Sequence, residues 1–185
     1  MRTQKILKVA VSCVVVAAIL ILSTLIIQKA SIRSLANETR EILPSFLFTD
    51  AFSGQAVSSD ALVKGQLPIV IIYFHPDCEY CKHEAKALQD NKNLTKNIIW
   101  VLVSAADKSK IQEFATGYNL HNEANFHFLM DDKDGFYKHF GVSGVPNIFI
   151  YQKDKTLVKH FRGETKLSTI LHFANSVGED TDPSN

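Results

Sequence analysis

Apolar blocks separated by polar segments organise the chain. The central block, residues 69–74, is an uninterrupted run of β-branched and aromatic side chains, which is typical of a strand buried on both faces. The polar residues 75–77 end this run, and a helical pattern begins after them. The pattern therefore predicts a central strand, a short loop and a helix whose first turn carries Cys78 and Cys81.

The same two periodicities recur along the rest of the chain. Strand-like apolar blocks lie at residues 97–103, 126–130, 148–151 and 156–161. Apolar residues at helical spacing predict helices over residues 108–118, 134–140 and 166–176. Ahead of the central strand, residues 45–62 predict two short strands joined by a turn that contains Gly54, followed by a small capped turn. This alternation predicts an α/β domain in which parallel strands are joined by right-handed crossovers.

A long apolar stretch near the N-terminus predicts a membrane anchor. Residues 9–27 are uncharged and mostly apolar, and at about 1.5 Å per helical residue they can cross a hydrocarbon core of roughly 30 Å. Arg2, Lys5 and Lys8 precede the stretch, which favours a cytoplasmic N-terminus with the rest of the chain on the far side of the membrane. Because the stretch is longer than the apolar region of a cleaved signal peptide, we expect a retained anchor.

Composition limits the remaining possibilities. The chain has 185 residues, of which 46% are hydrophobic and 21% charged, enough for one ordinary domain with an appendage. Its formal net charge of +1 gives no support to nucleic-acid binding. The predicted organisation is a cytoplasmic N-terminus at 1–8, a transmembrane anchor at 9–27, a stalk at 28–43, the α/β domain at 44–176 and a polar tail at 177–185.

The pair of cysteines on the predicted helix is the strongest chemical signal. Cys78 and Cys81 are three positions apart, so they share one face of a helix at about 5–6 Å, a separation that a disulfide can bridge. The free amides and the dipole of a helix N-terminus favour a thiolate, which is the attacking species in disulfide exchange. The sequence therefore predicts a redox-active dithiol.

Other functions for the two cysteines fit less well. A structural zinc site usually needs a second pair of Cys or His ligands, and the chain has no second Cys-x-x-Cys motif. An inert disulfide that closes so short a loop would remove little entropy from the unfolded chain. Copper binding, with His75 as a third ligand, stays open as an alternative.

Two motifs together resemble those of a known family. Phe74 followed by the motif at residues 78–81, with Gly144-Val145-Pro146 ahead of a later apolar strand, resembles the thioredoxin-like fold. The N-terminal hairpin with Phe52-Ser53-Gly54, and the extra strand–helix unit between the central strands, resemble the membrane-anchored TlpA-type thiol–disulfide oxidoreductases. The resemblance covers roughly residues 44–175.

The resemblance implies a role for each motif residue. Cys78 would be the attacking thiolate, and Cys81 the buried thiol that resolves the mixed disulfide. Pro146 would be a cis-proline that faces the pair, with the backbone of Val145 pairing to an extended substrate segment. Glu84 matches an acidic position that moves protons for the buried cysteine in part of the group; the alternative is an ordinary solvated helix glutamate.

The resemblance also implies a function. The protein would reduce disulfides of proteins outside the cytoplasm, in the bacterial periplasm, and its substrates would be disulfide-containing proteins. The two cysteines would carry out the reaction alone, without a cofactor or a metal. Because an oxidising compartment supplies no electrons, a membrane electron donor would have to reduce the pair again after each cycle.

The sequence departs from the family pattern immediately before the first cysteine. Many members have Trp there, whereas this chain has Asp77. Carboxylates at Asp77 and Glu79 flank Cys78, and nearby negative charge disfavours a thiolate; alternatively, Asp77 caps the helix. We therefore expect a reducing pair, with a potential nearer to thioredoxin at about −270 mV than to the strong oxidants of the superfamily at about −120 mV.

Two further protein classes are kept as alternatives. A peroxide-reducing enzyme shares the overall layout, but its family pattern has Thr or Ser three residues before the reactive cysteine, where this chain has His75. A copper-binding assembly factor typically has three residues between its two cysteines and adds a distal histidine, whereas this chain has two residues between them. We expect His83 to be helix surface, and His75 to be either a loop residue or a source of positive charge for Cys78.

Overall fold

A computed structural model describes residues 42–133 and 135–176. The predicted cytoplasmic N-terminus, the predicted anchor at 9–27, nearly all of the stalk and the polar tail lie outside these residues. Within the described ranges, no helix is both long enough and apolar enough to cross a membrane.

The strands and helices follow the order expected from the sequence. The strands are β1 (Leu47–Asp50), β2 (Ala56–Ser58), β3 (Ile69–Tyr73), β4 (Ile99–Ser104), β5 (Phe126–Met130), β6 (Asn147–Tyr151) and β7 (Leu157–Arg162). The helices are α2 (Ser59–Leu62), α3 (Glu79–Asp90), α4 (Lys92–Thr95), α5 (Lys108–Gly117), α6 (Gly135–Phe140) and α7 (Leu167–Asn175), and a short 3-10 turn, η1 (Val63–Gly65), follows α2.

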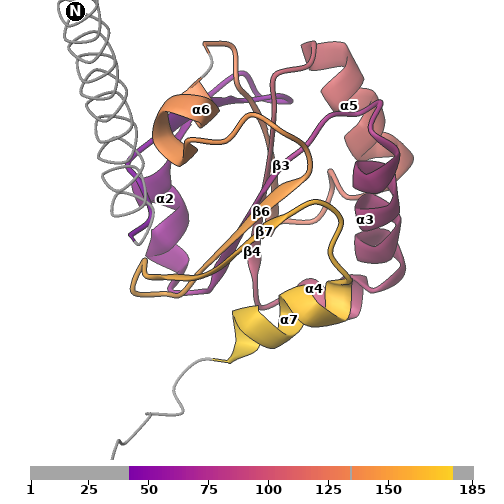
Figure 1. Ribbon diagram of the computed structural model, residues 1–185. Helices are drawn as coiled ribbons and strands as arrows, with labels where there is room; N and C mark the ends of the chain where they lie inside the picture. Colours follow the sequence, from indigo (N-terminus) through magenta and orange to yellow (C-terminus); the bar gives the residue numbers. More distant parts are fainter. Residues whose placement is uncertain (1–41, 134, 177–185) are drawn as a thin grey trace, which may run out of the picture. The chain divides into compact units, whose positions relative to one another are not determined.

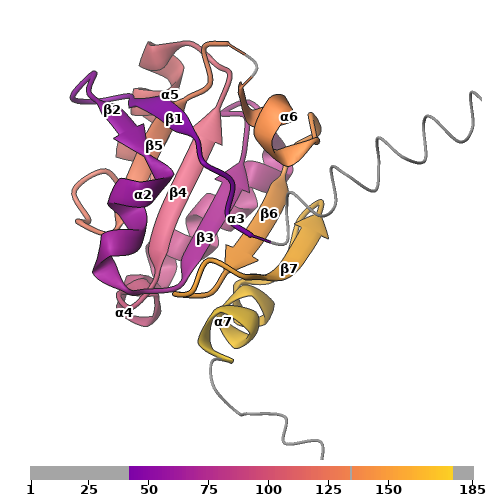
Figure 2. The ribbon, with the colours of Figure 1, turned by 90° about the vertical axis from the view of Figure 1, so that its left-hand side faces the viewer.

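One mixed sheet of seven strands runs through the domain, in the order β2-β1-β5-β4-β3-β6-β7 (Figure 2). Strands β3, β4 and β5 are parallel neighbours, as the strand–helix alternation predicts. Strand β6 pairs antiparallel with both β3 and β7, and the N-terminal hairpin β1–β2 joins the sheet by pairing antiparallel with β5. The predicted α/β architecture is therefore confirmed.

Helices cover both faces of the sheet (Figure 1). Helices α3, α5 and α7 pack on one face, and their inward side chains form a core cluster with Trp100 and Phe128. Helices α2 and α6 cover the other face, where Phe136 and Phe140 pack against Phe149. Because helices cover it on both sides, the central strand β3 can consist of apolar residues alone.

The register of β3 and β6 determines which loops meet. Tyr73, the last residue of β3, pairs with Asn147, the first residue of β6. Since the two strands are antiparallel, the loop that leaves β3 and the loop that enters β6 lie at the same edge of the sheet. Residues 75–78 and 144–146 are therefore brought together, although they are far apart in the sequence.

Short elements account for most differences from the expectation. Helix α4 was not expected, because its four residues are too few to show a helical period.

The predicted N-terminal hairpin and the capped turn that follows this hairpin are confirmed: the N–H of Ala61 donates to the Ser58 hydroxyl at 3.2 Å. Gly54 in the hairpin turn has a φ of 71°, a conformation that glycine adopts without a steric penalty.

Candidate redox-active site

Cys78 and Cys81 lie at the N-terminus of α3, as predicted. Cys78 is the N-cap residue, with extended backbone angles (φ −81°, ψ 121°), and is half-buried, whereas Cys81 is only 2% exposed. Both thiols are free. The N–H of Cys78 donates to the His75 carbonyl at 3.0 Å, and the N–H of Lys82 donates to the Cys78 carbonyl at 3.0 Å. These bonds hold the first cysteine at the surface and direct the second into the core.

Burial distinguishes the Cys81 thiol from the more accessible thiol of Cys78. Desolvation raises the pKa of Cys81 far above its ordinary value, and the adjacent Cys78 side chain and the charge of Glu84 add to the rise, while a backbone hydrogen bond at His75 opposes it. Cys81 is therefore a thiol at neutral pH, and it becomes a nucleophile only when another group removes its proton.

Lysines compensate the carboxylates that flank Cys78. Lys110 donates to Asp77 at 2.9 Å, and this hydrogen bond and the lysine charge lower the pKa of Asp77. Lys82 does the same for Glu79 at 2.6 Å. The alternative that Asp77 caps the helix was wrong, because Cys78 is the N-cap residue and the Asp77 carboxylate turns to Lys110 on α5. Both carboxylates that flank Cys78 therefore have a lysine as their ion-pair partner.

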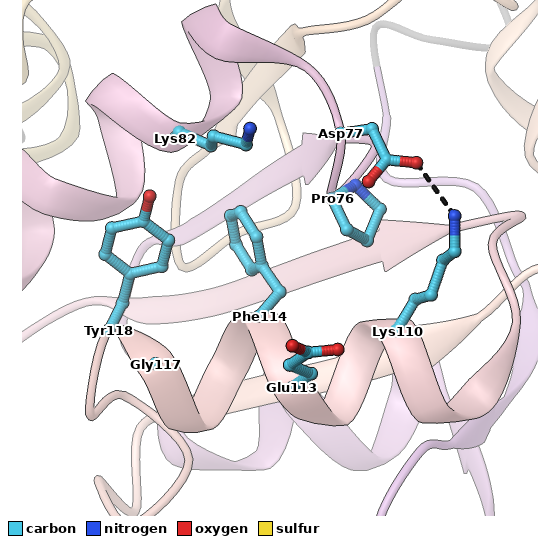
Figure 3. A pocket seen from close by; sticks show the side chains of 8 residues that line it. All are labelled: Pro76, Asp77, Lys82, Lys110, Glu113, Phe114, Gly117 and Tyr118. Carbon is cyan, nitrogen blue, oxygen red and sulfur yellow. Dashed lines mark hydrogen bonds and ion pairs between the residues drawn. The ribbon is translucent and has the colours of Figure 1, made fainter.

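A hollow of about 530 Å³ opens beside Asp77, between the start of α3 and α5. Figure 3 shows Lys82 on one side of it and the α5 side chains on the other, with Asp77 directed toward Lys110. The lining residues are Pro76, Asp77, Lys82, Lys110, Glu113, Phe114, Gly117 and Tyr118.

The side chain of His75 interacts with Asp77. Its Nδ1 accepts a hydrogen bond from the Asp77 N–H at 3.2 Å and lies 3.9 Å from Oδ2 of the Asp77 carboxylate. This contact gives no support to His75 as a source of positive charge for Cys78. In residues 42–133 and 135–176, no group of three or more His, Cys, Asp or Glu side chains is arranged to hold a metal ion.

Glu84 lies one helical turn after Cys81, on the same buried face of α3. It is 6% exposed, and its Oε1 accepts a hydrogen bond from the Thr165 N–H at 3.0 Å. Desolvation raises the pKa of Glu84 to about 8; the charge of Glu164 contributes to the rise, while the Thr165 hydrogen bond opposes it. The alternative of an ordinary solvated glutamate was therefore wrong.

The Val145–Pro146 peptide bond is cis, as predicted. The loop around it is held by side chains from the sheet: Asn147 Nδ2 donates to the Gly144 carbonyl at 2.7 Å, and His160 Nε2 lies 2.8 Å from Asn147 Oδ1. Since that oxygen can only accept, His160 donates from Nε2. Val145 packs against the same core cluster as Cys78, so both loops are supported by the same buried residues.

Sequence reasoning missed the residues that support the site. Lys110, Asn147, His160 and Thr165 each contact a site residue or its loop. None of them belongs to a motif, and Lys110 and Thr165 are 33 and 81 positions away from their partners. Only the folded chain brings them together.

Solved structures with the same arrangement establish the fold. A secreted disulfide oxidoreductase of Mycobacterium tuberculosis, homologous to E. coli DsbE, superposes with a TM-score of 0.60 at 22% identity, covering 74% of this chain and 96% of that chain. The peroxidoxin BcpB of M. tuberculosis superposes with a TM-score of 0.63 at 16% identity, covering 74% of this chain and 96% of that chain. The thioredoxin domain of a thiol-disulfide oxidoreductase from Bacteroides vulgatus superposes with a TM-score of 0.57 at 16% identity, covering 74% of this chain and 97% of that chain. The domain has a thioredoxin-like fold.

Residues 39–160 match the AhpC/TSA family, and the chain belongs to that family. A comparison with curated protein sequences found no match. Family membership and fold together support a redox enzyme in general, and they accommodate both thiol–disulfide oxidoreductases and peroxiredoxin-like proteins.

The raised pKa of Glu84 predicts an unusual dependence of stability on pH. Between its ordinary pKa of 4.5 and its folded pKa of about 8, the folded protein holds a proton that the unfolded chain releases, so stability falls as pH rises. Each pKa unit corresponds to about 1.4 kcal/mol, so the loss should reach a few kcal/mol. Denaturant unfolding of wild type and Glu84→Gln at pH values across this window measures it.

Glu84→Gln should largely remove this decline, because its amide does not titrate. Glu113→Gln, at an exposed position on α5, is the matched control and should keep the wild-type pH profile. The same decline in wild type and Glu84→Gln would contradict the assignment of the raised pKa to Glu84.

Proposed function

We propose that the protein is a membrane-tethered TlpA-type thiol–disulfide oxidoreductase that reduces disulfides of extracytoplasmic proteins. The observation that carries the proposal is the difference in burial between the two thiols. Cys78 is accessible at a helix N-terminus, while Cys81 is buried beside it with a raised pKa. Such a pair suits an attack by the first cysteine followed by resolution by the second.

The proposed cycle begins when the Cys78 thiolate attacks a substrate disulfide. A mixed disulfide forms, and the other substrate sulfur leaves as a thiolate. The Cys81 thiol then loses its proton to the Glu84 carboxylate and attacks Sγ of Cys78. The Cys78–Cys81 disulfide forms, the remaining substrate sulfur leaves as a thiolate, and one electron pair has passed from enzyme to substrate.

The loop before β6 is the proposed substrate-binding segment. The cis Val145–Pro146 bond lies at the sheet edge where the loop that carries Cys78 leaves β3. An extended substrate segment would pair with the backbone of Val145, next to the attacking sulfur. The hydrogen bonds of Asn147 and His160 keep this loop in place and thereby support that role.

The proposed location follows from the sequence. Residues 9–27 would anchor the chain as a single span, with the catalytic domain outside the cytoplasm, in a bacterial periplasm. Disulfides persist there because no thiol pool reduces them. The protein would therefore receive electrons from a donor in the same membrane.

Membership of the AhpC/TSA family and the likeness to a peroxidoxin favour a second candidate, a peroxide reductase. In that case Cys78 would attack a peroxide, become a sulfenic acid and condense with Cys81 to a disulfide and water. The Thr or Ser of the peroxidase pattern is His75 here, and its Nδ1 is occupied by the Asp77 N–H. Disulfide reduction is the better supported of the two.

Trapping in living cells tests the proposed function. In a Cys81→Ser variant the mixed disulfide cannot be resolved, so substrate proteins should stay bound to Cys78 and be recovered after acid quench and alkylation. Wild type should be mostly reduced, and a Cys78→Ser/Cys81→Ser variant should capture nothing. A mostly oxidised wild-type pair, or rapid Cys78-dependent peroxide consumption without protein adducts, would contradict the proposal.

The role of Glu84 predicts the pH dependence of resolution. A chromogenic aromatic disulfide releases one coloured thiolate when Cys78 attacks and a second when Cys81 resolves, so a stopped-flow trace separates the steps. The second rate should rise with pH through about 8 as Glu84 ionises. Glu84→Gln should slow it by about 100-fold and remove the inflection, since general bases contribute factors of this order.

The first release serves as the internal control for this experiment, because Glu84 takes no part in the attack by Cys78. Asp90→Asn, at the exposed C-terminal end of α3, should leave both releases unchanged. A Glu84→Gln variant with the wild-type second rate and pH profile would show that Glu84 does not accept the proton of Cys81.

The Asp77–Lys110 ion pair predicts a shift in reduction potential. Lys110→Met leaves the Asp77 carboxylate uncompensated beside Cys78, which disfavours the thiolate and hence the reduced form. The potential should become more negative, by on the order of 10 mV because the pair is exposed. Equilibration with glutathione buffers measures it, with Lys108→Met as the control on the same helix. A wild-type potential well above −200 mV would mark an oxidant rather than a reductant.

A further inference from the structure

A hollow of about 440 Å³ lies beside the cis-proline, between the loop that joins α6 to β6 and the end of β7. Figure 2 shows the end of β7 next to the start of β6, the strand that follows this loop. The described residues that line it are 141–147, Arg162 and Gly163. We call it the proline-loop hollow.

Arg162 is the only charged side chain among these lining residues. It is exposed, and its guanidinium forms no ion pair or hydrogen bond with any residue that the structure describes. Glu164, two positions further on, interacts elsewhere: its Oε1 lies 3.2 Å from Nδ1 of His83, which is exposed on α3 as expected. Within the described chain, the positive charge of Arg162 is therefore not neutralised.

The loop adds backbone donors to this charge. The N–H groups of residues 142–145 donate to no residue that the structure describes. The N–H of Gly163, in contrast, donates to the Pro146 carbonyl at 2.9 Å and so holds the end of β7 against the loop. Successive unpaired backbone N–H groups favour an anion, and the planar guanidinium of arginine suits a carboxylate. The proline-loop hollow thus presents hydrogen-bond donors and a positive charge, with no negative side chain among its described lining residues.

The sheet register brings this hollow within reach of a bound substrate. Tyr73 pairs with Asn147, and Asn147 pairs with Arg162. Neighbouring strands are about 4.8 Å apart, so the Cα of Arg162 lies roughly 10 Å from the end of β3, where the loop with Cys78 begins. Because an extended segment covers about 3.4 Å per residue, a residue about three positions from the attacked cysteine reaches the hollow.

We propose that the proline-loop hollow binds a carboxylate of the substrate, and that Arg162 selects disulfides with an Asp or Glu close to the attacked cysteine. The inference rests on the proposed function and deepens it, because it names the substrate class. The substrate segment pairs with the backbone of Val145, and its acidic side chain enters the hollow. The guanidinium and the free N–H groups of residues 142–144 then bind the carboxylate. Arg162 is a specificity residue and takes no part in the exchange of sulfur atoms.

Short peptides and the reduced full-length protein test this selection. Each peptide has one cysteine in a disulfide with a chromogenic aromatic thiol, and both peptide ends are blocked, so a side chain supplies the only carboxylate. When Cys78 attacks the peptide sulfur, the coloured thiolate leaves and reports the second-order rate constant. Wild type should react about fivefold faster with Glu two residues from the cysteine than with Gln there, as expected for an exposed ion pair with added hydrogen bonds.

Variants at Arg162 separate selection from the intrinsic reactivity of each peptide. Arg162→Gln should lose the preference for the Glu peptide and react with the Gln peptide as fast as wild type. Arg162→Glu should instead prefer a peptide with Lys at the same position. Arg162→Lys keeps the charge without the planar donor group, so it should retain part of the preference for Glu.

Lys159→Gln is the matched control. It removes one positive charge from the same strand, but the Lys159 ammonium lies over the rings of Phe161 and Phe173, 5.9 and 5.4 Å from their centroids. This variant should keep the wild-type preference for the Glu peptide. Equal rate constants for the Glu and Gln peptides in wild type would overturn the inference. A preference that survives in Arg162→Gln, or an equal loss of rate with every peptide in that variant, would also overturn it.

The inference and the proposed function can fail separately. Release from all peptides without any charge preference would overturn the role of Arg162 and leave the oxidoreductase intact. A reduced protein that releases no coloured thiolate through Cys78 from any peptide would overturn the proposed function, and the selection with it.

Discussion

Burial of the inner face of α3 is the constraint on which the site depends. Cys81, Glu84, Ala85 and Leu88 occupy this face at helical spacing. The first, third and fourth of them pack into the core cluster against the sheet, while the segment around Thr165 covers Glu84. Burial of the two apolar side chains stabilises the fold. The same burial raises the pKa of both Cys81 and Glu84, so the packing that fixes the helix also separates a protected thiol from the accessible one at Cys78.

A second constraint is the antiparallel pairing of β3 with β6. It brings the loop of the cysteines and the loop of the cis-proline to one edge of the sheet. Neither loop has regular structure, so each needs contacts of its own. Asn147 and His160 supply them for the proline loop, and Lys110 holds Asp77 beside the cysteines. The site is thus built from side chains of β6, β7 and α5 as much as from the motif itself.

The fold could be predicted where periodicity is strong and local. The β3–β5 strands, the longer helices and the two motifs all follow from patterns within single segments. The burial of Glu84 could not be predicted in this way, because a glutamate on a helix is usually solvated and only the distant Thr165 segment covers it. Asp77 shows the same limit: its local chemistry favours a helix cap, but a lysine 33 positions away competes for the carboxylate.

The packing of α3 affects the proposed resolution by Cys81 more than the proposed attack by Cys78. A buried thiol with a raised pKa reacts only after another group takes its proton, and in the proposed cycle that group is Glu84. Glu84 in turn has one buried oxygen without a hydrogen-bond partner in the part of the chain that the structure describes. A peroxide reductase needs polar groups directed at the first cysteine, and the nearest candidate, His75, interacts instead with Asp77. The buried chemistry therefore supports the proposed disulfide exchange, in which release of the mixed disulfide is the demanding step.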